Sequence, residues 1–175
     1  MGRLDQKEDN VKDLFYNFPS REFQVREISR LSFVPKTTVQ RILGDLIKEK
    51  MVVAKKGNVF RSYLADNTSF WYLFFKRNDL VEHIYSSGLV TFLEDIFHPK
   101  TIILFGSGAK GEYVKESDID LFLLAGEKNI DLSKFEKKLK RKINVIFKES
   151  YSDLNAELFN NIINGVKLSG YIKLR

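Results

Sequence analysis

The chain contains no cysteine and only two histidines among its 175 residues. The lack of cysteine excludes disulfide bonds, zinc sites built on thiolates and a thiol nucleophile. His83 and His98 are distant in sequence and have no cluster of metal ligands beside them. We therefore interpret both histidines as structural or surface residues rather than metal ligands.

Long apolar runs are also lacking. No run reaches the roughly 18 residues that a membrane helix needs, and Met1–Asn10 is polar and charged, which is not typical of a signal peptide. With 43% hydrophobic residues the chain has enough apolar material for a core. We expect a cytoplasmic protein with no membrane partner.

Positive charge is in excess, and most of the excess lies early in the chain. Residues 1–67 hold 13 Lys or Arg against 9 Asp or Glu, a net +4, whereas the remainder holds 16 against 14, a net +2. A basic small domain favours a nucleic-acid partner. The alternative is a solvated basic surface, because charge alone does not identify a partner.

The first third of the chain predicts three helices followed by a hairpin. Apolar residues recur at helical spacing, and a short strand is expected at Phe23 and Val25. Proline at position 35 favours a helix that begins there. The predicted helices are 7–18, 26–31 and 36–50, and the predicted strands are 51–54 and 59–64, joined by a turn at Lys55–Asn58.

This order of elements resembles a winged helix-turn-helix domain, over residues 1–67 as a domain. The resemblance implies that the third helix enters the major groove of duplex DNA and that the hairpin touches the backbone. The residues it assigns to base edges are Lys36, Thr37, Thr38, Gln40 and Arg41, and those it assigns to phosphates are Lys55, Lys56, Asn58 and Arg61. The alternative is that these residues form a solvated surface and that the winged fold serves only protein contacts.

A run of aromatic residues follows the hairpin. Five aromatic side chains fall within Phe70–Phe75, and we expect an aromatic linker helix at 68–79 that is buried between domains or between two subunits of a homodimer. A stacking platform for nucleic acid is a less favoured alternative, because residues in a row on a helix point in all directions. A second helix is expected over 78–97, with Gly88 as a kink.

The C-terminal half opens with a buried strand, Thr101–Phe105, that ends in a glycine-rich turn, Gly106–Gly111. Three glycines in that turn let the backbone approach a ligand closely. Backbone amides there, with the Ser107 hydroxyl, form a cradle for phosphate. The spacing matches neither a Walker loop nor a dinucleotide fingerprint.

Two acidic residues begin the next predicted strand, 117–124. Asp118 and Asp120 alternate, so their side chains point to the same face, with starting points about 6.6 Å apart. Two negative charges on an apolar strand are costly unless a cation neutralises them, and Mg²⁺ prefers carboxylate and phosphate oxygens. The phosphate cradle and the carboxylate pair together indicate phosphoryl or nucleotidyl transfer.

These residues resemble the minimal nucleotidyltransferases of the DNA polymerase β superfamily, over residues 80–175. The motif consists of Phe105–Gly111 followed by Ser117–Leu121, and the tail 159–174 is also similar. The resemblance implies an α+β fold with a mixed sheet and flanking helices. It implies that Asp118 and Asp120 bind Mg²⁺ and are catalytic, and that Gly106, Ser107 and Lys110 bind the nucleotide. For Lys110 the alternative is a solvated loop lysine.

One position departs from the family pattern. Active members carry a third acid on a later strand, and Asn144, on the predicted strand 143–147 after a helix at 131–142, takes that place. An amide cannot serve as a general base, and deleting such a base typically costs about 10²–10⁴-fold in rate. Glu149 follows that strand but lies past its centre. The basic run 137–142 is interpreted as a solvated helix face, with a nucleic-acid surface as the alternative.

Two functions therefore remain open. The first is an enzyme that binds Mg-NTP and transfers a nucleoside monophosphate to a hydroxyl of a protein, nucleic acid or small molecule. The second is a catalytically degenerate transcriptional regulator or antitoxin-type module that binds nucleotide or a partner protein without turnover. Asp118 and Asp120 favour the first function, and Asn144 favours the second.

Overall fold

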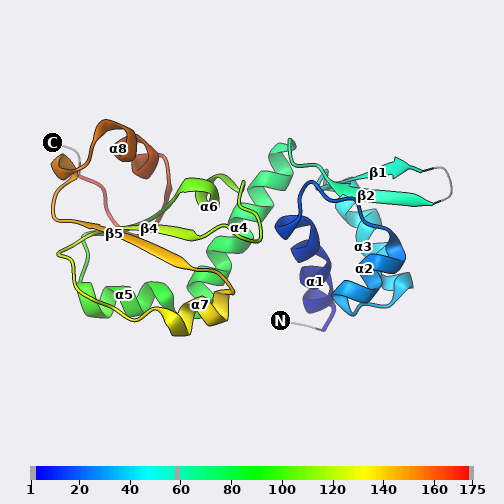
Figure 1. The fold of residues 1–175 in the computed structure, drawn as a ribbon, viewed down its shortest axis with the longest axis horizontal. Helices are drawn as coiled ribbons and strands as arrows, with labels where there is room; N and C mark the ends of the chain where they lie inside the picture. Colours follow the sequence, from blue (N-terminus) through cyan, green and yellow to red (C-terminus); the bar gives the residue numbers. More distant parts are fainter. Residues whose placement is uncertain (1–2, 58–59, 174–175) are drawn as a thin grey trace. The chain divides into compact units, whose positions relative to one another are not determined.

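The structure is a computed structural model that describes residues 3–57 and 60–173. Its packing divides the chain into two units, Met1–Lys76 (unit 1) and Arg77–Arg175 (unit 2), which are considered separately. The boundary between the units lies inside a single helix, α4 (Phe70–Ser87) (Figure 1).

Helix α4 replaces the two helices that the sequence predicted around residue 78. Asn78 and Asp79 are of the type that starts helices, but apolar burial runs through them. Tyr72, Leu80 and Ile84 are buried at steps of four or eight residues along one side, so one continuous helical face packs inward. The helix ends where Gly88 adopts a left-handed φ of 84°, and a separate helix begins at the next residue.

The described part of unit 1 comprises three complete helices, a two-stranded hairpin and the first part of α4. Strands β1 and β2 are antiparallel, with Val52 opposite Ala65 and Lys56 opposite Arg61. The strand expected at Phe23 is a single bridge to Tyr63, because Val25 already begins the second helix. The elements are α1 (Arg3–Asn17), α2 (Val25–Ser32), α3 (Lys36–Lys48), β1 (Val52–Lys56) and β2 (Arg61–Ala65).

The core of unit 1 explains why α3 sits as it does. Val39, Ile42, Leu43 and Leu46 are all buried and recur at helical spacing, which fixes one side of the helix against the rest of the unit. The exposed side of α3 is mostly polar, apart from Ile47 near its end. Phe23 is fully buried and packs edge-on against Phe15 of α1, with ring centroids 5.5 Å apart.

Unit 2 is built on a four-stranded mixed sheet in the order β5-β4-β3-β6. Strand β3 pairs antiparallel with both β4 and β6, and β4 pairs parallel with β5. The elements are α5 (Leu89–Phe97), β3 (Thr101–Phe105), α6 (Gly106–Lys110), β4 (Ile119–Leu124), α7 (Ser133–Leu139), β5 (Ile143–Lys148), the short η1 (Tyr151–Asp153), α8 (Ala156–Ile163) and β6 (Val166–Gly170).

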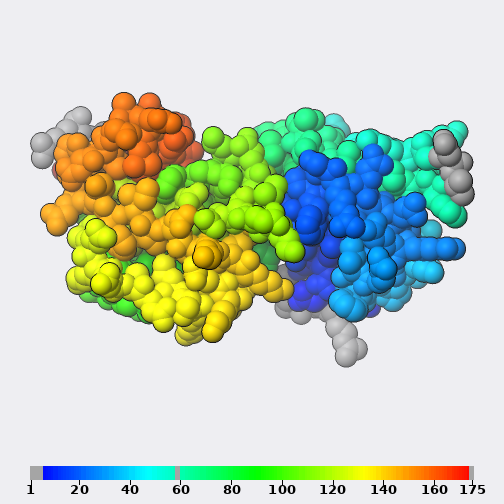
Figure 2. Space-filling view, viewed as in Figure 1, coloured from blue at the N-terminus to red at the C-terminus, as the bar shows by residue number. Residues whose placement is uncertain are grey.

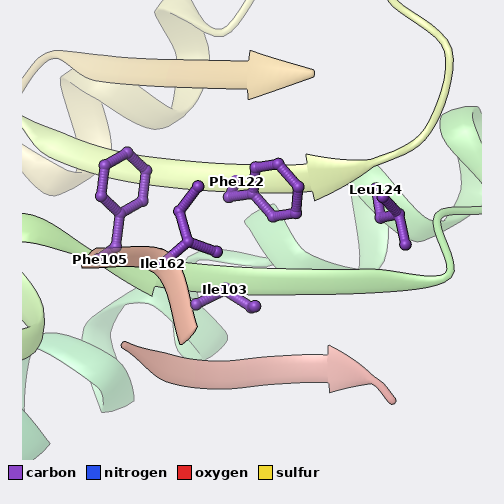
Figure 3. Close-up of a cluster of buried hydrophobic side chains, with 5 residues drawn as sticks. All are labelled: Ile103, Phe105, Phe122, Leu124 and Ile162. Atoms are coloured by element: carbon purple, nitrogen blue, oxygen red, sulfur yellow. The ribbon is translucent and has the colours of Figure 1, made fainter. Parts of the chain in front are cut away.

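One face of this sheet carries a buried cluster under α8. Figure 3 shows Ile162 of that helix among side chains from β3 and β4, which alternate so that every second residue points the same way. The cluster consists of Ile103, Phe105, Phe122, Leu124 and Ile162. Because Phe105 lies opposite Asp120 in the antiparallel register, Asp120 points to this same face, beyond the apolar cluster.

The other face of the sheet is covered by helices α5 and α7 (Figure 1). Phe92 of α5 packs on Phe135 of α7 with ring centroids 4.8 Å apart, and Phe97 lies 4.9 Å from Phe147 of β5. The expected mixed sheet with flanking helices is therefore present in unit 2. None of the helices in residues 3–57 and 60–173 combines the length and apolar character needed to cross a membrane.

Candidate functional site

Three polar side chains meet at the beginning of strands β4 and β5. The Asn144 side-chain amide nitrogen donates to Asp118 Oδ2 at 3.1 Å and to Asp120 Oδ1 at 3.2 Å. Asp118 and Asp120 are half-buried and Asn144 is exposed. The two carboxylates therefore converge on a single point, and the amide N–H groups occupy that point.

The strand register brings these residues together. Asp120 lies opposite Asn144 in the parallel β4–β5 pair. Residues two apart on a strand share a face, so Asp118 joins Asp120, with Asn144 on the adjacent strand. Further along the same face, Phe122 is buried beneath α8. The face is thus apolar where α8 covers it and acidic at its uncovered end.

Gly106 is fitted closely against the carboxylate pair. Its φ is +69°, a left-handed conformation that residues with a Cβ rarely adopt. A Cβ placed there would also lie 2.7 Å from Asp120 Oδ2, too close for any real contact. Glycine at this position therefore allows both the turn out of β3 and the approach of the Asp120 carboxylate.

The predicted nucleotide-binding residues fall in one short helix. Gly106 and Ser107 begin α6 directly after β3, and Lys110 ends it as an exposed residue. Across the described residues, 3–57 and 60–173, no hydrogen bond is made by the half-buried Ser107 hydroxyl. The structure thus brings Gly106 and Asp120 together. It leaves the roles of Ser107 and Lys110 toward phosphate as predictions.

The loop that leads into Asp118 is held by Arg141, although the basic run that contains Arg141 was predicted to be a solvated helix face. Arg141 Nη1 donates to the carbonyl oxygens of Val114, at 2.5 Å, and of Ser117, at 3.0 Å. Its guanidinium carbon lies 4.6 Å from the centre of the Tyr113 ring. The expected helix 131–142 ends early, at Leu139, because Lys140 turns with φ 54°. That turn places Arg141 beside this loop.

Among the described residues, no further acid completes the carboxylate pair. Within residues 3–57 and 60–173 there is no group of three or more His, Asp or Glu side chains that could hold a metal ion. His83 Nδ1 instead faces Asp79 at 3.2 Å, and His98 is an exposed residue at the end of α5.

The arrangement nevertheless fits a divalent cation. Both carboxylates already point at one atom, the Asn144 nitrogen, so their oxygens are arranged as two ligands of a common ion would be. Carboxylate and amide oxygens are both suitable ligands for Mg²⁺. Rotating the Asn144 amide by half a turn would present its oxygen to a cation in place of its nitrogen.

Comparison with known proteins agrees with this geometry. Residues 86–166 match the family model described as a nucleotidyltransferase domain, and this range includes Gly106, Ser107, Asp118, Asp120 and Asn144. Over these residues unit 2 is therefore similar to a nucleotidyltransferase domain. A search of curated proteins found no match.

In unit 1, the residues predicted to contact bases lie at the start of α3. Lys36, Thr37, Gln40 and Arg41 are exposed, and Thr38 is half-buried. Arg41 Nη1 lies 3.7 Å from Asp45 Oδ2, one turn along the helix. The exposed residues at the start of α3 are therefore polar, as groove binding would require.

The predicted phosphate contacts lie on the hairpin strands. Lys55 and Lys56 end β1 and Arg61 begins β2, and all three are exposed. Lys55 Nζ is bound to Glu22 Oε1 at 2.7 Å, and the Ser62 hydroxyl donates to the other oxygen of that carboxylate. Asn58, assigned to the same role, is outside the described residues. The Glu22 interaction had no signal in the sequence, because Glu22 precedes Lys55 by 33 residues.

Proposed function

We propose that unit 2 binds Mg-NTP and transfers a nucleoside monophosphate to an acceptor hydroxyl. The observation that carries this proposal is the convergence of Asp118 and Asp120 on one point beside Gly106. The match of the surrounding residues to a nucleotidyltransferase domain supports the same reaction class.

The residues of the site would divide into metal ligands and phosphate-binding groups. Asp118 and Asp120 would hold Mg²⁺ through one oxygen each, and the Asn144 amide oxygen would complete the protein's share of the ligands. The metal supplies charge neutralisation at the phosphates. Ser107 and the backbone amides at the start of α6 would donate hydrogen bonds to the triphosphate.

The transfer reaction can proceed without a proton-accepting side chain at position 144. The acceptor hydroxyl oxygen forms a bond to the α-phosphorus, the bond from that phosphorus to the bridging oxygen breaks, and pyrophosphate leaves. Because an amide accepts no proton, the hydroxyl proton passes to solvent. We therefore expect slower turnover than a third carboxylate would give, by about 10²–10⁴-fold.

The test uses α-labelled NTPs, Mg²⁺ and a host lysate that supplies acceptors. We expect transfer by the wild-type chain, loss of transfer in Asp118→Ala/Asp120→Ala, and faster transfer by Asn144→Asp. Mg-NTP should also raise the melting temperature of the wild type but not of the double variant. A matched control is Asp95→Ala, which removes an exposed acid on α5.

The Asn144 contacts also favour a second function, nucleotide binding without turnover. The amide already neutralises the carboxylate pair through hydrogen bonds, so the fold does not depend on a cation. A melting-temperature shift with Mg-NTP but no transfer by the wild type would select this regulator or antitoxin-type module. Absence of both the shift and the transfer would refute both functions.

We further propose that unit 1 is a winged helix-turn-helix that binds duplex DNA. The exposed polar start of α3 and the basic ends of β1 and β2 support this assignment. Arg41→Ala and Lys56→Ala should each weaken an electrophoretic shift on duplex DNA. Lys12→Ala, on α1 and paired with Glu8, is the control. Undiminished binding by both α3 and hairpin variants would contradict the assignment.

The aromatic residues of α4 support a homodimer. Tyr72 is buried and its hydroxyl donates to the Phe15 carbonyl oxygen at 2.9 Å, but Phe70 is 69% and Trp71 45% exposed. Light scattering should report a dimer that Trp71→Ser/Phe70→Ser converts to monomer. A wild-type monomer at every concentration would contradict this proposal.

A further inference from the structure

A second charged surface lies next to the carboxylate pair, on the C-terminal end of α7 and the start of β5. Six cationic side chains fall within residues 134–142, against one acid, Glu136. A shallow open depression of about 330 Å³ lies among them. It is lined by Ser133, Glu136, Lys137, Lys140, Arg141 and Lys142. In Figure 2 this part of the chain, yellow to orange, lies at the surface.

Several of these charges have structural partners within unit 2. Lys138 Nζ donates to the carbonyl oxygens of Ser86 and Ser87, each at 3.0 Å, at the end of α4. Arg141 holds the loop before Asp118. The Glu136 carboxylate accepts from the Ile143 amide at 3.0 Å. These contacts explain why the three residues are present without invoking a ligand.

Lys140 and Lys142 have no such explanation. Both are exposed, and in residues 3–57 and 60–173 neither amine takes part in an ion pair or hydrogen bond. Lys137 lies close enough to Asp131 to add to the lowering of that carboxyl's pKa, which the Ser133 backbone amide causes chiefly. Positive charge is thus uncompensated where the α7–β5 connection enters the sheet.

The uncompensated charge is continuous with the carboxylate site. The Ile119 amide donates to the Lys142 carbonyl oxygen at 2.8 Å. Ile119 lies opposite Ile143, so the register places Lys142 next to Asp118, on the face that Asn144 shares. Because β5 is an edge strand of the sheet, no further strand in the described part of the chain covers this approach to the site.

A polyanionic acceptor requires positive charge beside the carboxylate pair. Two carboxylates repel a phosphodiester chain. Nearby lysines offset that repulsion when they neutralise phosphates and release the counterions condensed on the nucleic acid. An open depression suits an extended backbone better than an enclosed pocket for a single small molecule.

We propose that Lys140 and Lys142 bind the phosphate backbone of a nucleic-acid acceptor and guide its end to the carboxylate pair. This inference rests on the proposed transfer function and names its acceptor class. The basic run therefore has two kinds of cation. Lys138 and Arg141 hold the fold, whereas Lys140 and Lys142 face a ligand.

The experiment is lysine footprinting of the full chain by amine acylation and mass spectrometry, with a short single-stranded DNA or RNA oligonucleotide and no Mg²⁺ or NTP. We expect the oligonucleotide to protect Lys140 and Lys142 several-fold. Lys167, exposed on β6 at the opposite edge of the sheet, should keep its reactivity. Because neither metal nor turnover is required, this test can fail while nucleotide transfer succeeds, and the reverse.

Binding measured against salt gives a second readout. Lys140→Ala/Lys142→Ala should lower the slope of log affinity against log salt by about 1.4, which corresponds to roughly 25-fold weaker binding at about 0.1 M salt. Lys167→Ala should leave both unchanged. Protection of these lysines by NTP or polyglutamate but not by the oligonucleotide would overturn the proposal. So would equal reactivity of Lys140, Lys142 and Lys167 in its presence.

Discussion

Gly106 and Asp120 are packed so closely that a single methyl group on the glycine would come within 2.7 Å of the carboxylate oxygen. Gly106 directly follows β3 and Asp120 is the second residue of β4, so the contact joins the two motifs of the nucleotidyltransferase pattern. Strain and crowding coincide at this position, which allows their effects to be separated by substitution.

Substituting alanine at each of three glycines should separate the effect of backbone strain from that of crowding. Gly44 has a free environment and ordinary helical backbone, so Gly44→Ala should stabilise unit 1 by about 0.5–1 kcal/mol. Gly88 has the left-handed φ but no neighbour within 4 Å, so Gly88→Ala should cost about 1–2 kcal/mol. Gly106→Ala adds the clash and should cost more, measured by thermal and chemical unfolding. Equal costs at Gly88 and Gly106 would argue against crowding by Asp120.

Asn144→Asp should make unit 2 depend on divalent cations. The substitution removes both donated hydrogen bonds and places a third negative charge beside two others, so we expect about 1–3 kcal/mol lower stability in chelator. Mg²⁺ at a hundred times its dissociation constant should restore about 2.7 kcal/mol. Asn144→Ala, which adds no charge, is the control. A melting temperature of Asn144→Asp that does not respond to Mg²⁺ would count against the metal site.

Arg141→Lys should loosen the approach to Asp118 while keeping the positive charge. A lysine cannot reproduce the planar donor group that contacts the Val114 and Ser117 carbonyls, and leaving such carbonyls unsatisfied costs about 1–3 kcal/mol. We expect weaker Mg²⁺ binding by calorimetry as well as lower stability. Loss of stability with unchanged Mg²⁺ affinity would restrict Arg141 to a structural role.

Glu22 should couple the hairpin of unit 1 to pH. Hydrogen bonds from Lys55 and Ser62 hold the pKa of the Glu22 carboxyl below its usual value. Because the folded pKa is lowered, this contribution to stability is present above the unfolded pKa and is lost as pH falls through the folded pKa. Melting curves between pH 6 and about pH 3 should therefore show a flatter decline for Glu22→Gln than for the wild type.

The same substitution should also change DNA binding if unit 1 binds duplex DNA. Glu22→Gln releases Lys55 from its ion pair, which leaves the lysine amine available to contact a phosphate. We expect tighter binding by fluorescence anisotropy, with a steeper salt dependence. Weaker binding would indicate that Glu22 positions the hairpin rather than competing for Lys55.

The local patterns in the sequence predicted most of the elements, but not the contacts between distant residues. The run 101–105 and the alternation from Asp118 identify two strands because burial and periodicity are local properties. That Asn144 lies against both carboxylates depends on the parallel register with β4, and only a family resemblance pointed to position 144 in the sequence. The role of Arg141 could not be predicted, because charge runs usually face solvent and the turn at Lys140 has no glycine to mark it.

Helix α4 shows a case in which a local sequence pattern gave a wrong prediction. Its polar residues near position 78 imitate the start of a helix, and local pattern alone divided it there. The buried row through Tyr72, Leu80 and Ile84 overrides that signal, because packing against the rest of the fold outweighs capping preferences of about 1 kcal/mol.

The position of β6 has a consequence for the order in which unit 2 can be built. Strand β3 is buried along its whole length, yet one of its two neighbours is supplied by residues 166–170, more than sixty positions later. During synthesis from the N-terminus, β3, β4 and β5 can pair while one hydrogen-bonding edge of β3 still lacks its partner. A ribosome stalled before residue 166 would therefore hold a nascent chain that already contains Asp118, Asp120 and Asn144 but presents an apolar strand edge. Such a chain is a substrate for chaperones and a hazard for aggregation.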